Sequence, residues 1–372
     1  MENTNSVLFN NLCDNQQVRL NVGQIFNVVP ATHVGLAWDR IEGMILGLAV
    51  GDALGNETEG IAPAERIRSF GEIRDYHPRR SLGGLKIGLP SDDTQLAAWT
   101  LEHLNIHGSL VPDQLAEVFV SRRLFGAGST IRQFIGNMQS GVSWFQAGPV
   151  SAGNGALMRI APVLIPYLRE PSPSLWVDTA LAAMITHNDT ASIASCLAFV
   201  AVLWDVLGMN VSPEGGWWAK RFIEVVQDVE DTSTYKLASR LNSSYMWRFS
   251  EFLEYAVRVA RENDLTTAQA ESLTGSGAYL LETVPTVLSI LERHGHDPEE
   301  AIIRAVNDAY DNDTIGAIVG AAVGALHGAE RLPKRWKTGL TGRTGPSDDG
   351  RLFDLLEDAR SRFGSREIAQ FG

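Results

Sequence analysis

From Trp38 onward, hydrophobic positions recur every three or four residues, the spacing that places them on one face of an α-helix. The pattern predicts helices at 39–54, 62–70, 92–106, 112–124, 129–139, 155–167, 175–186, 189–207, 216–229, 233–241, 246–263, 277–293, 298–309, 314–328 and 352–363. No run of alternating strands appears in this part of the chain. We therefore expect an all-α fold, with one compact multi-helix domain over residues 38–372.

The first 37 residues follow a different pattern. They are rich in Asn and Gln and poor in charged side chains. Residues 18–22, Val-Arg-Leu-Asn-Val, alternate between apolar and polar, which predicts a short strand in an otherwise loose arm. Two interpretations remain open: a disordered tail, or an arm that binds a partner.

Two apolar segments carry glycine at every fourth position. They are GMILGLAVGDALG, from Gly43 to Gly55, and GAIVGAAVGALHG, from Gly316 to Gly328. Glycine costs about 1 kcal/mol in a helix interior, so four on one face indicate a flat stripe where another backbone approaches closely. We expect both helices to lie deep in the core, against each other.

Two acidic clusters stand at the starts of predicted helices. Each has a hydroxyl and two aspartates: Ser91, Asp92 and Asp93 in the first, and Asp311, Asp313 and Thr314 in the second. Helix capping explains either cluster alone, but a helix N-terminus also favours the ionised carboxylate that a metal needs. Oxygen ligands without histidine or cysteine favour Mg²⁺ or Mn²⁺, and this many ligands predict two ions.

Three further acids lie near these clusters. Glu59 follows the first glycine-rich helix and is a candidate to face the metal site. Asp52, on that helix, has two possible roles: it supports the metal ligands indirectly, or it caps a helix. Asp308 lies one turn before the second cluster, and we expect it to be outside the metal ligands or to face solvent.

Two glycine-bearing loops lead into predicted helices and could bind phosphate. FGAGST contains Gly126, Gly128 and Ser129, and SAGNGALMR contains Gly153, Asn154 and Gly155. Backbone N–H groups at such a junction can bind an anion, and two loops about 25 residues apart are compatible with a diphosphate. His187, in THNDTA, has two possible roles: a core or capping residue, or a residue that hydrogen-bonds to a ligand hydroxyl. Arg159 either forms an ion pair or contacts the ligand.

Composition narrows the classes of function and location. The chain of 372 residues has a net charge of −13, which argues against non-specific nucleic-acid binding. The stretch 314–325, which we take as the longest apolar run, is too short and too glycine-rich to cross a bilayer. The two cysteines do not suggest a disulfide framework, and the N-terminus lacks the apolar core of a signal peptide. We expect a cytoplasmic protein without membrane or nucleic-acid partners.

Six motifs in order resemble the ADP-ribosylglycohydrolase family, of the dinitrogenase-reductase-activating glycohydrolase type. They are ILGLAVGDALGNETEG, SDDTQLA, GAGST, SAGNGALMRIAP, THNDTA and AVNDAYDNDTIGAIVGA, within residues 40–332. The resemblance implies an all-α domain with two Mg²⁺ or Mn²⁺ ions in a cleft, which removes ADP-ribose from modified side chains, often arginine.

The resemblance also assigns roles to residues. It implies that the metal ligands are Ser91, Asp92, Asp93, Asp311, Asp313 and Thr314, and that Glu59 takes part in catalysis with Asp92 and Asp93. It implies phosphate contacts from 126–130 and 153–155, and a ribose contact from His187. Asp92 or Asp93 would act as general base or orient the water, while adenine contacts from 140–152 are not evident.

The expected partner is an ADP-ribosylated protein. Some relatives of this type are bacterial immunity proteins against ADP-ribosyltransferase toxins, and can carry an N-terminal extension. Residues 1–37 resemble such an extension in placement, and 18–22 could add to the edge of a toxin's sheet. The alternatives are a toxin-neutralising binding protein with secondary catalysis, a hydrolase of another ADP-ribose linkage, and a regulatory glycohydrolase of the nitrogenase type.

Overall fold

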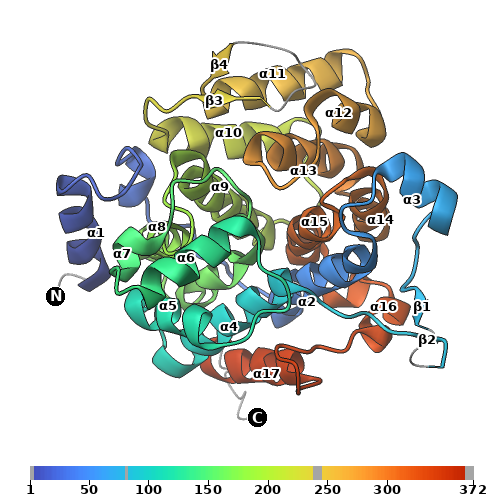
Figure 1. Ribbon diagram of the computed structural model, residues 1–372, viewed down its shortest axis with the longest axis horizontal. Coiled ribbons are helices and arrows are strands. Elements are labelled where there is room, and N and C mark those ends of the chain that lie inside the picture. The colour runs from blue at the N-terminus through green and yellow to red at the C-terminus, as the bar shows by residue number, and fades with distance from the viewer. Residues whose placement is uncertain (1–3, 80–82, 238–244, 365–372) are drawn as a thin grey trace.

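The computed structural model describes residues 4–79, 83–237 and 245–364, and these form a bundle of helices (Figure 1). The α-helices are α1 (Thr4–Asp14), α2 (Trp38–Gly55), α3 (Pro63–Phe70), α4 (Asp92–His107), α5 (Pro112–Ser121), α6 (Ser129–Gln139), α7 (Trp144–Ala147), α8 (Ser174–Met184), α9 (Thr190–Leu207), α10 (Trp217–Val229), α11 (Phe249–Glu262), α12 (Thr267–Thr274), α13 (Leu280–His294), α14 (Pro298–Asp308), α15 (Asn312–His327), α16 (Lys334–Gly339) and α17 (Arg351–Phe363). The prediction of an all-α fold is confirmed.

The strands are short and lie at the periphery. β1 (Pro78–Arg79) pairs antiparallel with β2 (Leu85–Lys86), and β3 (Tyr235–Lys236) pairs antiparallel with β4 (Met246–Trp247). The 3₁₀ helices are η1 (Gln24–Asn27), η2 (Asn56–Thr58), η4 (Leu157–Arg159), η5 (Ala161–Tyr167) and η7 (Ala329–Arg331).

The two glycine-striped helices, α2 and α15, cross the middle of the molecule side by side (Figure 1). A methyl group added to Gly47 would clash with the carbonyl oxygen of Gly320, and one added to Gly51 would clash with that of Gly316. The partner number falls as the glycine number rises, so the helices run antiparallel. The expected close approach is confirmed, and it brings the end of α2 to the start of α15.

The most apolar long helix is α9. It has the length and composition to cross a membrane, but 94% of its 18 residues are buried inside this fold. It contacts α8, α10 and α15, so its hydrophobicity is that of a central core helix. The stretch 314–325, singled out from the sequence, is therefore not the longest apolar run in the chain.

Two of the predicted helices are wrong. The range 155–167 is not an α-helix but η4 and η5, because Pro162 and Pro166 lack the N–H that an α-helix needs. In the range 233–241, residues 235–236 form β3, and 238–241 lie outside the described residues. The short helices α7, α12 and α16 were missed because their few turns carry little periodicity.

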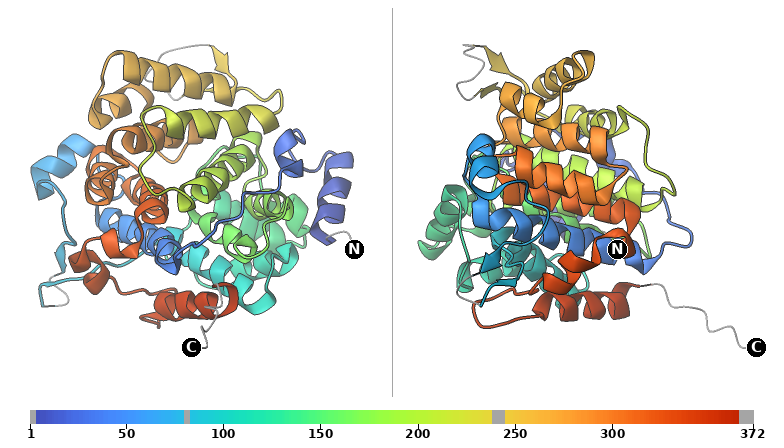
Figure 2. Two further views of the ribbon diagram at one scale, coloured as in Figure 1. Left: turned by 180° about the vertical axis from the view of Figure 1, so that it is seen from behind. Right: turned by 90° about the vertical axis from the view of Figure 1, so that its right-hand side faces the viewer.

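The N-terminal segment is folded rather than loose. Residues 4–14 form α1, whose Phe9 and Leu12 are buried in the core, and 18–22 form no strand with any described residue. Figure 2 shows this dark-blue segment passing across the back of the molecule from α1 to α2. The expectation of a disordered tail or loose arm is wrong for residues 4–37.

Hydrogen bonds fix this segment to the helices beneath it. The Asn21 N–H donates to the carbonyl of Val229, and the indole N–H of Trp204 donates to the carbonyl of Ala31. The Asp228 carboxylate accepts from backbone N–H groups at the start of η1. The backbone that was expected to pair with a partner's sheet is thus bonded to its own domain.

Candidate functional site

A cleft of about 750 Å³ gathers the candidate residues from six separate parts of the sequence. All of them except Ser91 line it: Glu59, Asp92, Asp93, Gly126, Gly128, Ser129, Gly153, Asn154, Gly155, His187, Asp311, Asp313 and Thr314. Ser91 lies just behind this surface, where its hydroxyl donates to Asp93 at 2.7 Å.

One wall of the cleft is built at the start of α4. Ser91 is the N-cap, and its hydroxyl accepts from the Asp93 N–H. The carboxylate of Asp52, from α2, accepts from the N–H groups of Ser91 and Thr94 at 2.8 and 3.0 Å. Asp52 therefore caps α4 from a neighbouring helix, which bears out the capping interpretation and fixes Asp92 and Asp93 relative to α2.

The opposite wall is built at the start of α15. Thr314 N–H donates to Asp313 at 2.9 Å, and the Asn154 amide donates to Asp311 at 2.6 Å. Asn154 also donates to Thr283 on α13. Sequence reasoning assigned Asn154 to substrate, whereas its side chain here connects the second glycine loop to the acidic cluster.

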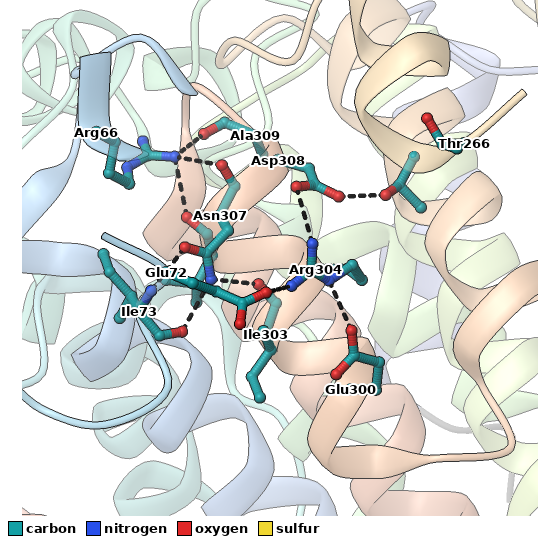
Figure 3. Close-up of polar contacts among 12 residues, drawn as sticks. Arg66, Glu72, Ile73, Thr266, Glu300, Ile303, Arg304, Asn307, Asp308 and Ala309 are labelled. Carbon is teal, nitrogen blue, oxygen red and sulfur yellow. Dashed lines mark hydrogen bonds and ion pairs between the residues drawn. The ribbon is translucent and has the colours of Figure 1, made fainter. Parts of the chain in front are cut away.

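The turn between α14 and α15 is anchored by Arg66 of α3 (Figure 3). Its guanidinium donates to the carbonyls of Val306 and Asn307 at 2.9 and 3.2 Å, as well as to that of Ala309. Asp308 points away from the cluster, since it accepts from Thr267 and pairs with Arg304 at 3.4 Å. It is buried in an ion pair rather than facing solvent, and its bonds lead away from the proposed ligands.

The acids form two groups that share one residue. Carboxylate oxygens of Asp52, Asp93 and Asp313 lie within 4.8 Å of one another, as do those of Glu59, Asp311 and Asp313. Oδ1 of Asp93 is buried and has no hydrogen-bond partner among the described residues. An unsatisfied carboxylate oxygen facing other carboxylates fits a hard cation, which would supply the missing positive charge.

The protein itself compensates these charges weakly. Burial, with the other acids nearby, raises the pKa of Asp92 to about 7, and burial raises the pKa of Asp52 and Asp311 to about 6. Burial and neighbouring carboxylates also raise the pKa of Asp93 and Asp313 well above the usual range. Within the described residues, no basic side chain pairs with any of the five.

The first glycine loop leads into a helix N-terminus that could bind an anion. Gly128 is the N-cap of α6, with no side-chain cap, so the first N–H groups of this helix are free to bind a ligand in the cleft. A methyl group on Gly126 would lie 3.3 Å from Oδ1 of Asp92, so this loop also borders the acids. The prediction that it leads into a helix is confirmed.

The second glycine loop works differently from the prediction. It leads into η4, which is only three residues long, so a helix dipole cannot account for anion binding there. Its glycines instead leave room for His187: a methyl group on Gly155 would lie 2.9 Å from the imidazole Cε1. The loop thus places the histidine against the cleft, where burial and the nearby Arg159 lower its pKa to about 3.

Sequence reasoning missed several residues that border the cleft, namely Arg132, Ser151, Met158, Ala278 and Tyr279. The Ser151 and Thr130 hydroxyls lie 2.9 Å apart and connect the two glycine loops. Ala278 and Tyr279 lie directly before α13, with Tyr279 as its N-cap, and nothing in the local pattern distinguishes them. Asp52 was noted from the sequence without a settled role; it directly follows the stripe glycine Gly51, and its carboxylate accepts hydrogen bonds from the start of α4.

Comparison with known proteins gives a consistent result. Residues 34–367 match the family model described as ADP-ribosylglycohydrolase. A protein of Archaeoglobus fulgidus, described as uncharacterized, is 32% identical over 312 residues, with 82% of this chain and 92% of that protein covered. The ADP-ribosyl-[dinitrogen reductase] glycohydrolase of Rhodospirillum rubrum is 28% identical over 313 residues, with 81% of this chain and 90% of that protein covered.

Two further similarities bear on activity and fold. The ADP-ribosylarginine hydrolase Tri1 of Pseudomonas putida is 25% identical over 316 residues, with 81% of this chain and 74% of that protein covered. A solved structure described as an ADP-ribosylglycohydrolase-related protein complex has a TM-score of 0.60 at 24% identity. The match covers 89% of this chain and 99% of that chain. At that identity the structure supports the fold alone.

Proposed function

Because this chain belongs to the ADP-ribosylglycohydrolase family, whose members are ADP-ribosyl hydrolases, we propose that it removes ADP-ribose from modified arginine side chains with the help of two divalent cations. The observation that supports this most is the pair of acidic groups at the base of the cleft, joined through Asp313. They lie beside a helix N-terminus that suits phosphate, so one cleft combines both requirements of an ADP-ribose substrate.

The cations would be held by Asp93 and Asp313 with Asp52 or Ser91 nearby, and by Glu59, Asp311 and Asp313, with Thr314 adjoining. When bound, Mg²⁺ or Mn²⁺ acts as a Lewis acid that stabilises negative charge on ribose oxygens and on a water molecule. The donor set of carboxylates and hydroxyls favours these hard ions over zinc.

Asp92 is the better placed of the two candidates for general base. It borders the cleft and is only partly buried, whereas Asp93 is buried and accepts a hydrogen bond from Ser91. A carboxylate in this position can take a proton from water as the water attacks C1 of the ribose. The C1–N bond then breaks, and the guanidine nitrogen leaves with its electron pair and is protonated.

The remaining residues would orient ADP-ribose. The free N–H groups at the start of α6 can bind the diphosphate, and Arg132 on the first turn of the same helix brings a positive charge to the cleft. His187 can donate from Nε2, because that nitrogen has no acceptor among the described residues and lies beside Gly153 and Gly155.

The linkage is tested with a panel of substrates. Peptides carrying ADP-ribose on arginine or on serine, together with O-acetyl-ADP-ribose, are incubated with the protein in Mg²⁺, in Mn²⁺ and in EDTA, and released ADP-ribose is measured. We expect release from arginine, dependent on the metal. Preferential release from serine or from the acetyl ester would reject the arginine assignment, and full activity in EDTA would reject metal dependence.

An immunity role remains a further hypothesis for the N-terminal segment. It is supported by the presence of an N-terminal segment outside the matched family domain, which begins at residue 34. Because residues 17–21 are bonded to their own domain, a toxin would contact the exposed side of this segment, not a free strand. Charge-reversing substitutions at Arg19, which is exposed, should weaken binding to a cognate transferase; unchanged affinity argues against contact at this position.

A further inference from the structure

Arg159 is a charged side chain in an apolar place. It is fully buried, and no carboxylate pairs with it among the described residues. Its guanidinium lies over the ring of Phe119, and Nε and Nη1 have no hydrogen-bond partner. Burying an arginine in this way is unfavourable, so packing alone does not explain it.

The bonds that Arg159 does make lead to His187. Nη2 donates to the carbonyl of Ala182 at 2.9 Å and to the Thr186 hydroxyl oxygen at 2.8 Å. The same oxygen lies 2.9 Å from Nδ1 of His187. The three side chains form a chain of hydrogen bonds that starts in the core and ends at the imidazole.

The direction of these hydrogen bonds follows from counting donors. Arginine can only donate, so the Thr186 oxygen accepts from it and has one hydrogen of its own to place. Nδ1 of His187 is the one further acceptor near this hydroxyl within the described parts of the chain. If Nδ1 carried a hydrogen instead, the Thr186 hydrogen would be buried without a partner.

We propose that Arg159 is a positioning residue that acts through Thr186: it orients the threonine hydroxyl toward Nδ1, and so places the only imidazole hydrogen on Nε2, facing the cleft. Nε2 lies at the second glycine loop, 3.3 Å from where a methyl group on Gly153 would sit. A neutral imidazole with its hydrogen there donates to an oxygen of the ligand. The identity of that ligand rests on the proposed function, whereas the tautomer of His187 does not depend on it.

The buried positive charge has a second consequence for the same ring. Burial lowers the pKa of His187, and the nearby cation lowers it further because it disfavours a second proton on the imidazole. The histidine then stays a neutral donor across the physiological range, so its affinity for an oxygen of ADP-ribose should not change between pH 5 and 8.

The test is ¹⁵N NMR of the imidazole nitrogens in the full-length protein, together with ADP-ribose binding by calorimetry in Mg²⁺. We expect His187 to be neutral with hydrogen on Nε2 from pH 5 to 8. Thr186→Val keeps the shape of the side chain but removes the hydroxyl, and should weaken ADP-ribose binding about tenfold; Thr186→Ser, the matched control, should stay within about threefold of wild type. Arg159→Met should resemble Thr186→Val if it folds.

Two results overturn the proposal. One is hydrogen on Nδ1, or protonation of His187 with a midpoint near its ordinary pKa. The other is Thr186→Val binding ADP-ribose as tightly as Thr186→Ser. If wild type does not bind ADP-ribose at all, the proposed function fails, and the NMR spectrum alone then decides the hydrogen-bond chain.

Discussion

Asp93 shows how one residue can be built for an ion. One of its carboxylate oxygens accepts from Ser91, and the other is buried without a partner beside Asp52 and Asp313. A cation that binds the folded state alone stabilises it by about 3 kcal/mol at a concentration 100 times its Kd. Mg²⁺ or Mn²⁺ should therefore raise the Tm of wild type more than that of Asp93→Asn, which keeps only the group Glu59, Asp311 and Asp313, as measured by calorimetry with and without EDTA. An equal rise in both proteins would place the metal elsewhere.

Asn154 separates support of the metal site from substrate binding. Its amide donates to Asp311 at 2.6 Å, so Asn154→Ala should release that carboxylate and lower the affinity for Mn²⁺ about 10- to 100-fold, the usual effect of removing such a support. Isothermal titration with Mn²⁺ measures this. If metal affinity stays the same while ADP-ribose affinity falls, Asn154 is a substrate residue, as its motif first indicated.

At the scale of elements, the antiparallel pair α2 and α15 determines where the site forms. A side chain on Gly320 would clash with the backbone of Gly47 and push the helices apart. Gly320→Ala should therefore lower the free energy of unfolding by about 3 kcal/mol, the upper end of the usual cost of overpacking, in denaturant titrations. Gly136→Ala in α6, where a methyl group would meet nothing within 4 Å, is the control and should be neutral or stabilising by up to about 1 kcal/mol. Similar losses in both would show that close packing of α2 on α15 is not the cause.

We expect the contact of α1 with α8 to depend on pH through Asp178. Asp178 accepts from Asn5 of α1 at 2.7 Å and from Tyr167 at 2.6 Å, and its burial raises its pKa from 3.8 to about 6. Between those values the folded state holds a proton that the unfolded chain has lost, so the stability of the folded state falls as pH rises from about 4 to about 6. The full effect corresponds to about 3 kcal/mol.

Asp178→Asn should remove this dependence. Chemical denaturation of wild type and variant at pH values from 4 to 7 measures the difference in unfolding free energy between them. We expect the variant to gain relative to wild type as pH rises through this range. A constant difference would mean that Asp178 is ionised in both states.

Elements and site residues differ in how well the sequence predicts them. Long helices such as α13 follow from the repeating apolar positions, and α2 against α15 follows from the matched glycine spacing. The α-helix predicted for 155–167 was wrong because the apolar residues have helical spacing, while the prolines favour 3₁₀ turns. Residues 4–37 were predicted to be loose because most of their side chains are polar. Their few apolar side chains nevertheless pack, as do Phe9 and Phe26, whose ring centroids lie 4.9 Å apart.

For the molecule as a whole, sequence order says which motifs are present but not how they meet. The clusters at 91–93 and 311–314 lie at the starts of different helices, and only the path of α2 beneath both brings them together. Cleft residues such as Ala278 and Tyr279 carry no local signature, because tertiary contacts alone give them their position. The net charge of −13 agrees with a site that uses bound cations rather than basic side chains.

The most direct test of this account is a crystal of the protein grown with Mn²⁺ and measured for anomalous scattering. The account predicts two strong peaks, one among Asp52, Asp93 and Asp313 and one among Glu59, Asp311 and Asp313. A single ion, or manganese bound outside this cleft, would contradict the two-cation site on which the proposed hydrolysis depends.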